Sequence, residues 1–433
     1  MKVGFISLGC SKNLVDTEMT IGLFKKNGYK IVNNEEEADI IVVNTCGFIE
    51  SAKEEAINTI LEMAEHKKKK CKYLIAMGCL VERYKEEILK VIPEVDLWIK
   101  YSSYDTIWNQ IENLIKTEKT NCDKLNFLDR TITTGENFAY LRIAEGCSNF
   151  CTYCAIPKIR GKFISRTIED ILEEAEKLAK DGYKEIIVIA QDTTKYGIDI
   201  YGKPMLAELL EKLCKIDGIK WIRFLYSYPE TITDELIEVV KKEEKICKYF
   251  DIPIQHISDS VLKRMNRKST QEQIENLIKK IKKEIPEVVL RTSLIVGFPG
   301  ETEEDFEKLY NFVEKANFDK LGVFKYSKED GTPAARLPEQ IHYKIKEKRH
   351  KTIMELAQKI SKQKLEEKIG NKYKMLVETK TFDGKYYVGR TYMDIPDEDG
   401  LVFIPNEKPN LEGKWINVEI TDEKNYDLIG KQC

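Results

Sequence analysis

A chain of 433 residues is longer than most single domains, so we expect two or three domains, each able to bury a core. Charged residues make up 33% of the chain and hydrophobic residues 42%, which is typical of a soluble globular protein. The formal net charge of −3 gives no general reason to bind nucleic acid or an anionic membrane surface. No apolar run reaches the roughly 18 residues that a membrane-spanning helix requires.

The first residues, MKVGFISLGC, place a cysteine after a short apolar stretch, as the signal of a lipoprotein does. The stretch is very short and carries a single lysine, which argues against such a signal. We therefore expect a cytoplasmic protein. Because the cytosol is reducing, its eleven cysteines are not expected to form a disulfide framework.

Residues 1–115 alternate between predicted strands and helices. The strands are KVGFIS, ADIIVVN and KYLIAM, and the last two are nearly continuous apolar runs. Such runs are typical of a parallel sheet that is covered on both faces. The polar stretch over 116–136 has no clear period, and it is predicted to be a linker.

Residues 137–369 repeat the alternation with six further strands. These are AYLRIAE, EIIVIA, WIRFLYS, KYFDIP, VVLRTSLIVG and KLGVFKYS. Six βα units predict a partial barrel or a doubly wound sheet, whose working face lies at the carboxyl ends of the strands. The Lys- and Glu-rich run over 340–369 is predicted to be a connecting helix.

Residues 370–433 change in character, because short strands follow one another with Gly, Pro and Asp turns and no helix between them. The predicted strands are YKMLVETKT, KYYVGRTYM, LVFIP and KWINVEI. This pattern predicts a small all-β barrel.

Three cysteines stand where predicted strands of the first segment end. They are Cys10, Cys46 and Cys79, the N-terminal cysteine set, and each has a glycine beside it. Because the ends of parallel strands meet at one edge of a sheet, we expect the three thiols to meet. Thiolates gathered in this way select soft metals or iron–sulfur clusters. The alternative is three buried cysteines that cap strands and bind nothing.

Three more cysteines follow the first strand of the middle segment in a CxxxCxxC spacing. They are Cys147, Cys151 and Cys154, the core cysteine set. A structural zinc site normally has four protein ligands, and no fourth cysteine or histidine stands nearby. Three thiolates can instead hold three irons of a cubane cluster and leave the fourth iron open. The alternatives are a zinc site or incidental cysteines.

A CxxxCxxC loop after the first barrel strand resembles the radical S-adenosylmethionine superfamily. Together with the N-terminal cysteine set and the β tail, the chain resembles the methylthiotransferases of that superfamily. The resemblance implies an N-terminal methylthiotransferase domain over 1–115, a linker over 116–136, a radical core over 137–369 and a TRAM or OB-like barrel over 370–433. It also implies two 4Fe-4S clusters and S-adenosylmethionine as cofactors. The core set would hold the cluster that binds S-adenosylmethionine, and the N-terminal set an auxiliary cluster that delivers methylated sulfur.

Two classes of methylthiotransferase compete for this sequence. One modifies an aspartate of ribosomal protein twelve of the small subunit, and the other modifies an adenosine beside the tRNA anticodon. The strings SLGCSKNLVDTE and YFDIPIQHISDSVLKRMNR, with His256 where the tRNA enzymes usually have Ser, favour the ribosomal-protein class. The tail adds nine basic and twelve acidic residues, including DIPDEDG, which suits a basic protein substrate better than RNA. These acids alone would equally fit solvated loops.

The resemblance implies further partners. An electron donor such as flavodoxin or ferredoxin would drive cleavage of S-adenosylmethionine. The resulting radical would take a hydrogen from the β-carbon of the aspartate, which acid–base chemistry cannot reach. The ribosomal protein or the ribosome is the expected substrate, and neither a membrane nor strong nucleic-acid binding is expected. A non-enzymatic iron–sulfur scaffold or electron carrier is the alternative, although its clusters would normally have four protein ligands.

Other residues near the predicted site are weaker candidates. Those expected to contact the cofactor are Tyr153, Gln191, Gln255, Arg291 and Val296, the last within IVGFPGE, which resembles the adenine-binding strand end of the superfamily. Each is also compatible with an ordinary loop or strand position, and Arg160 either neutralises charge on the cofactor or forms an ion pair on the surface. The remaining cysteines have no partner spacing and are expected to be incidental: Cys71, Cys122, Cys214, Cys247 and Cys433.

Overall fold

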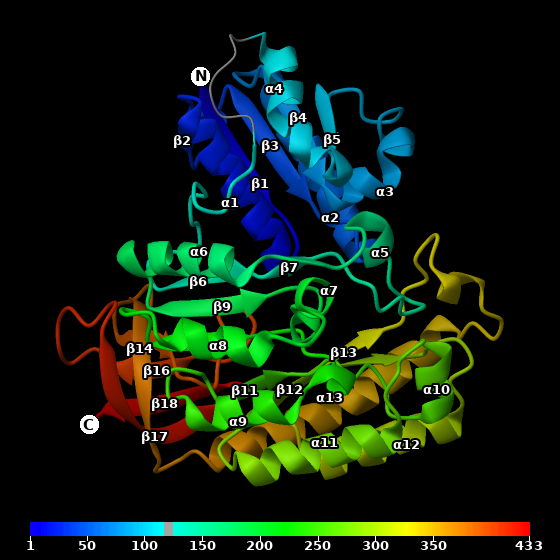
Figure 1. Ribbon diagram of the computed structural model, residues 1–433, viewed down its shortest axis with the longest axis vertical. Helices are drawn as coiled ribbons and strands as arrows, with labels where there is room; N and C mark the ends of the chain where they lie inside the picture. Colours follow the sequence, from blue (N-terminus) through cyan, green and yellow to red (C-terminus); the bar gives the residue numbers. More distant parts are fainter. Residues whose placement is uncertain (117–123) are drawn as a thin grey trace.

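The computed structural model describes residues 1–116 and 124–433, so Cys122 lies outside the described residues. Figure 1 shows the N-terminal sheet at the top, the strands and helices of the middle segment below it, and the tail barrel at the lower left. The chain is a mixed α/β protein with a parallel sheet, a partial barrel and a closed β-barrel, as the sequence predicts. Among the described residues, no helix has both the length and the apolarity needed to cross a membrane.

The N-terminal sheet is parallel throughout, in the order β2-β1-β3-β4-β5. The three predicted strands are its centre, and two short edge strands were missed. The strands are β1 (Lys2–Ser7), β2 (Lys30–Val32), β3 (Ile40–Thr45), β4 (Tyr73–Gly78) and β5 (Leu97–Lys100), and the helices are α1 (Ser11–Lys26), α2 (Glu50–Glu65), α3 (Cys79–Ile88) and α4 (Ile107–Ile115).

The middle segment contains all six predicted strands. They form two parallel three-stranded sheets, β10-β9-β6 and β11-β12-β13, which an isolated parallel bridge from Ile222 to Ile246 brings side by side. Together they make the predicted partial barrel. Its strands are β6 (Phe138–Arg142), β9 (Glu185–Ile189), β10 (Trp221–Phe224), β11 (Tyr249–Asp251), β12 (Val289–Val296) and β13 (Lys320–Lys325), and the short pair β7 (Ala144–Glu145) and β8 (Ile164–Ser165) follows β6.

The longer helices cover the outside of this partial barrel, and the short ones lie in the loops that follow its strands (Figure 1). They are α5 (Ile156–Ile159), α6 (Ile168–Lys180), α7 (Ile198–Tyr201), α8 (Leu206–Cys214), α9 (Asp234–Lys242), α10 (Asp259–Arg264), α11 (Gln271–Glu284), α12 (Glu303–Ala316) and α13 (Tyr343–Glu366). The helix predicted only as a connection is α13. Its residues Ile353, Leu356 and Ile360 are buried in the same hydrophobic core as the barrel strands, so it is also a packing element.

The described part of the predicted linker is bound to both neighbouring units. The Arg130 guanidinium is buried and forms ion pairs with Glu18 of α1 and Glu174 of α6, at 3.0 and 2.9 Å. The backbone N–H of Thr131 also donates to the Glu18 carbonyl. The sequence shows no period here because side-chain charges, and not a helix or strand, hold the segment between the two units.

The tail is a closed barrel in the order β14-β15-β16-β18-β17. Four of its strands were predicted, and the last strand was missed. The strands are β14 (Lys372–Lys380), β15 (Tyr386–Arg390), β16 (Val402–Pro405), β17 (Trp415–Lys424) and β18 (Asp427–Gln432).

Three of the four carboxylates in the acidic segment DIPDEDG contact the partial barrel. Asp394 pairs with Lys320 of β13 at 2.9 Å, and Glu398 pairs with Arg291 of β12. Asp399 accepts a hydrogen bond from the Tyr249 hydroxyl at 2.7 Å. These carboxylates therefore dock the tail onto the partial barrel.

A buried charge cluster completes that docking. Glu185 of β9 binds Arg223 of β10 at 2.5 Å and Arg390 of β15 at 2.8 Å, and the three side chains are fully buried. Arg223 also donates to the carbonyl of Thr391. Burial by itself would raise the pKa of Glu185, but the two arginines outweigh it and hold the pKa below its usual range.

We predict that Glu185→Gln lowers the free energy of unfolding by about 3–5 kcal/mol, since it leaves the buried Arg223 guanidinium without a carboxylate and leaves Arg390 with Glu378 alone. Urea unfolding followed by circular dichroism measures the change. As a control, Glu208→Gln removes an exposed carboxylate that pairs with Lys212, and it should change the free energy by less than about 1 kcal/mol. Equal effects of the two substitutions would contradict this account of the docking.

Candidate functional site

The N-terminal cysteine set lies at strand-to-helix junctions of the parallel sheet. Cys10 precedes the first residue of α1, Cys46 follows β3, and Cys79 is the first residue of α3. Gly9 has a φ of +86°, and a Cβ built on it would lie 2.7 Å from the Cβ of Cys46. Gly47 likewise lies against the backbone of Leu80. The glycines beside the cysteines therefore let the three junctions approach one another.

Asn13 ties the three junctions together. Its side-chain amide donates to the carbonyl of Leu8 at 3.0 Å and to that of Thr45 at 2.9 Å. Its side-chain oxygen accepts from the Cys79 thiol at 3.4 Å. Since Asn13 is fully buried, these bonds fix the relative positions of the segments that carry the N-terminal set.

The core cysteine set lies in the loop between β7 and α5. The loop turns sharply, because Gly146 has a φ of +72° and Phe150 a φ of +53°. The N–H of Cys147 donates to the Gly161 carbonyl at 3.1 Å, and the N–H of Cys154 donates to the Cys151 carbonyl at 3.0 Å. The three thiols thus project from one compact loop near the carboxyl ends of the barrel strands.

Both sets have the chemistry of cluster ligands. The described cysteines are free thiols. The backbone N–H of Ile156 donates to the Cys154 sulfur at 3.4 Å, a kind of contact that tunes iron–sulfur clusters. Burial raises the pKa of Cys147 to about 11 and that of Cys79 to about 12, so binding of iron must release protons.

No group of three or more His, Cys, Asp or Glu side chains in the described part of the chain is arranged to hold a metal ion. Two sets of free thiols nevertheless fit clusters, because a cubane gives each thiolate an iron of its own. Each set offers three sulfur ligands and no other donor, which favours a cluster with one open iron in each set.

The two sets meet at the boundary between the N-terminal sheet and the partial barrel. The Cys79 side chain packs in one small hydrophobic cluster with Ala155 and Ile159, which directly follow the core set. Arg160 lies at the same boundary, and its guanidinium is 3.8 Å from the Cys79 sulfur. Figure 1 shows the lower end of the N-terminal sheet directly above β6 and β7.

A buried ion network crosses this boundary. Arg160 binds Asp16 of α1 at 2.8 Å and Glu145 of β7 at 3.0 Å. Arg142 of β6 binds the same two carboxylates, at 2.6 and 2.9 Å. Burial would raise the pKa of Glu145, but Arg160 and Arg142 lower it to about 2. We name these four residues the boundary network. Arg160 is therefore buried and pairs with protein carboxylates, so the predicted surface pair is wrong.

Of the predicted cofactor contacts, Gln191 binds the boundary network, Tyr153 lies within the loop of the core set, and Gln255 follows β11. The Gln191 amide donates to Glu145 at 2.7 Å, and its oxygen is buried without a hydrogen-bond partner among the described residues. Burial raises the pKa of Tyr153 well above its usual value, and Tyr153 lies beside Cys151. Gln255 has a φ of +74°, and its N–H donates to the Ser293 carbonyl at 2.8 Å.

The other two predicted contacts are placed differently. The Val296 side chain is fully buried in the outer core between strands and helices, so only its backbone can face a ligand. Arg291 is engaged by two carboxylates, Asp251 at 3.1 Å and Glu398. The turn after Val296 is held by Glu301, which accepts from the Phe298 N–H at 2.9 Å.

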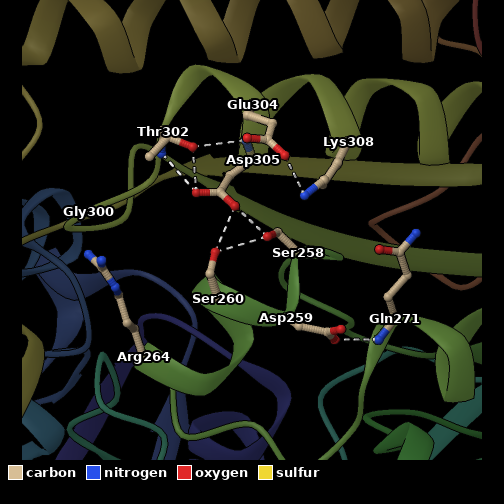
Figure 2. Close-up of a pocket in the computed structure, with 10 residues that line it drawn as sticks. All are labelled: Ser258, Asp259, Ser260, Arg264, Gln271, Gly300, Thr302, Glu304, Asp305 and Lys308. Atoms are coloured by element: carbon tan, nitrogen blue, oxygen red, sulfur yellow. Dashed lines mark hydrogen bonds and ion pairs between the residues drawn. The ribbon is translucent and has the colours of Figure 1, made fainter.

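His256, which the sequence offered as a subfamily signal, lies away from the thiols. It is fully buried, and its Nδ1 accepts from the Ser258 N–H at 3.0 Å. A hollow of about 340 Å³ lies on the nearby surface. Figure 2 shows Ser258 and Ser260 at this hollow, where both point toward Asp305 and donate hydrogen bonds to it. No cysteine lines this hollow.

Several residues of the site were missed by reading the sequence. Asn13 and Asp16 follow Cys10 in the string CSKNLVD, and Glu145 directly precedes the core set in EGC. Their position next to a ligand motif is a usable signal. Arg142 had no such signal, because its role depends on the docking of two separate units.

Family models match all three parts of the chain. The Radical SAM superfamily matches residues 141–313, the Uncharacterized protein family UPF0004 matches residues 2–100, and the TRAM domain matches residues 369–432. The solved structure of the radical S-adenosylmethionine methyltransferase TsrM from Kitasatospora setae has a TM-score of 0.59 at 12% identity, covering 77% of this chain and 76% of that one. That likeness concerns the fold alone.

Curated relatives match the whole chain. Ribosomal protein uS12 methylthiotransferase RimO of Alkaliphilus oremlandii (strain OhILAs) is 64% identical, over 100% of this chain and 99% of its own length. The protein of the same name from Lachnoclostridium phytofermentans (strain ATCC 700394 / DSM 18823 / ISDg) is 53% identical, over 99% of each chain. These matches confirm the predicted enzyme class and cofactors, and they favour the ribosomal-protein enzyme over the tRNA enzyme. The chain therefore belongs to the ribosomal protein uS12 methylthiotransferase family, whose members are radical enzymes that use S-adenosylmethionine and two 4Fe-4S clusters.

Proposed function

We propose that this chain transfers a methylthio group to the β-carbon of an aspartate in ribosomal protein uS12. The observation that carries the proposal is the meeting of the two cysteine sets, where Cys79 packs against Ala155 next to the core set. A reaction that joins a carbon radical to a sulfur group needs both sources at one place. Effective concentrations of this kind contribute several kcal/mol to catalysis.

We assign the core set to the cluster that binds S-adenosylmethionine and the N-terminal set to the auxiliary cluster. When bound, these groups supply one-electron chemistry and a transferable sulfur group, which protein side chains cannot provide. The chain itself contributes the thiolate ligands, excludes water by burying most of them, and fixes their separation through the boundary network.

Gln191 and Gln255 are proposed to touch S-adenosylmethionine through their side chains, and the buried side-chain oxygen of Gln191 lacks a partner among the described residues. Tyr153, which lies between Cys151 and Cys154, would contribute its backbone. Val296 would contribute its backbone. Arg291 is proposed to contribute indirectly, because its charge is already balanced by Asp251 and Glu398.

We also propose how the chain is organised and what it works with. Residues 1–115 would carry the sulfur source, 137–369 the radical chemistry and 370–433 a docked barrel that stabilises the core, with 116–136 between the first two. An electron donor such as flavodoxin or ferredoxin would act with it in the cytoplasm, where ribosomes are made. We expect uS12, and not nucleic acid, to be the main partner.

Mass spectrometry of a strain with and without this gene tests the proposal. Deletion should remove a methylthio group from the aspartate of uS12 and leave tRNA unchanged. A methylthio group lost only from a tRNA adenosine would contradict it and support the tRNA enzyme instead.

The cysteine assignments predict separable losses. Cys10→Ala should remove the auxiliary cluster, lower the iron content by about half and abolish methylthio transfer, while 5′-deoxyadenosine still forms. Cys151→Ala should abolish 5′-deoxyadenosine formation. Iron analysis and product quantification measure the two effects.

The matched control is Cys214→Ala, which changes a cysteine of α8 that is remote from both sets and should leave the iron content intact. Loss of 5′-deoxyadenosine formation in Cys10→Ala would show that the two sets do not divide the labour as assigned.

A further inference from the structure

Lys12 is a buried cation at the boundary between the two cysteine sets. It lies in the first turn of α1, two residues after Cys10, and only 6% of its surface is exposed. Its ammonium lies over the ring of Tyr226, 3.0 Å from the ring centroid. Tyr226 directly follows the strand region of β10, so Lys12 reaches from the N-terminal sheet to the carboxyl end of the barrel.

Among the described residues, no carboxylate lies within ion-pair distance of the Lys12 ammonium, and it makes no hydrogen bond there. The Cys10 side chain attracts it most strongly, and the two carboxylates that follow, Asp251 and Glu398, are both paired with Arg291. The second oxygen of Asp251 accepts from the Tyr226 N–H at 2.9 Å. A buried charge without a partner is costly, and a tyrosine face compensates it only in part.

The two arginines of the boundary network already have carboxylate partners. Arg160 and Arg142 share Asp16 and Glu145, so neither guanidinium is free to receive a new anion. Lys12 is thus a buried cation of this boundary that forms no ion pair with the described residues. Its position beside Cys10 puts it where a substrate must lie if sulfur is to reach it from the N-terminal set.

We propose that the Lys12 ammonium binds the side-chain carboxylate of the aspartate that is modified, and so selects aspartate as the substrate residue. The inference rests on the proposed function, since it names a contact to that substrate. A charged hydrogen bond holds the carboxylate, and with it the neighbouring β-carbon, between the two cysteine sets. The ring of Tyr226 contacts the ammonium and positions it, and the backbone N–H of Tyr226 donates a hydrogen bond to Asp251.

The proposal predicts discrimination between aspartate and asparagine. Purified uS12 with the natural aspartate should react with a kcat/KM roughly tenfold to a hundredfold higher than uS12 with asparagine at that position, because the amide carries no charge. In the Lys12→Gln enzyme this ratio should fall to about one, mainly through loss of activity on the aspartate protein. Methylthio product formed by the reconstituted holoenzyme is quantified by mass spectrometry.

Two controls separate binding from folding. Lys25→Gln removes an exposed lysine of the same helix and should keep the wild-type ratio. The iron content of Lys12→Gln and the electron paramagnetic resonance signal of its auxiliary cluster should match those of the wild type. Lys12→Arg, which keeps the charge, should restore part of the preference for aspartate.

The outcomes are distinguishable. If the wild-type enzyme forms no methylthio product on uS12, the proposed function itself is wrong. If the wild type modifies uS12 and Lys12→Gln retains the preference for aspartate, the role of Lys12 is wrong. A changed auxiliary-cluster signal with a retained preference would likewise overturn it, and would assign the ammonium to charge balance beside Cys10.

Discussion

Two arginines buried between the N-terminal sheet and the partial barrel hold the rest of the site in place. Arg142 and Arg160 come from the barrel unit, and both bind Asp16 of α1 and Glu145 of β7. A buried ion pair is weak evidence for stability, but it is demanding in geometry, because each charge is costly unless its partner is in place. The two units can therefore dock in few ways, and the docked arrangement brings the two cysteine sets together.

A second buried cluster of ion pairs lies at the other end of the barrel. There Glu185 lies between Arg223 and Arg390, and the tail barrel is joined to the core through them. Apolar packing accompanies both contacts. Val15 and Met19 of α1 share one hydrophobic cluster with Tyr140 of β6 and with Met393 of the tail. Charge thus specifies the docking while apolar surface supplies much of its free energy.

The cysteine sets and the strands that carry them were readable from the sequence because local patterns determine both. A buried parallel strand is a continuous apolar run, and its end is marked by Gly9 or Gly78 beside a cysteine. The site between the units was not readable in the same way. The charge of DIPDEDG was read as suiting a basic protein or a solvated loop, but Asp394 and Glu398 pair with Lys320 and Arg291 of the barrel. Ion pairs between residues so distant in sequence leave no periodic pattern. For the same reason the sequence could not predict that Lys12 is buried against Tyr226.

The distance between the two clusters tests the central claim most directly, namely that the boundary network fixes the two cysteine sets relative to each other. Pulsed electron paramagnetic resonance on reconstituted protein with both clusters reduced reports their dipolar coupling. We expect one narrow distribution of distances in the wild type and a broader one in Arg160→Leu, compared at equal iron content. A broad distribution in the wild type, or an unchanged narrow one in the variant, would contradict the account.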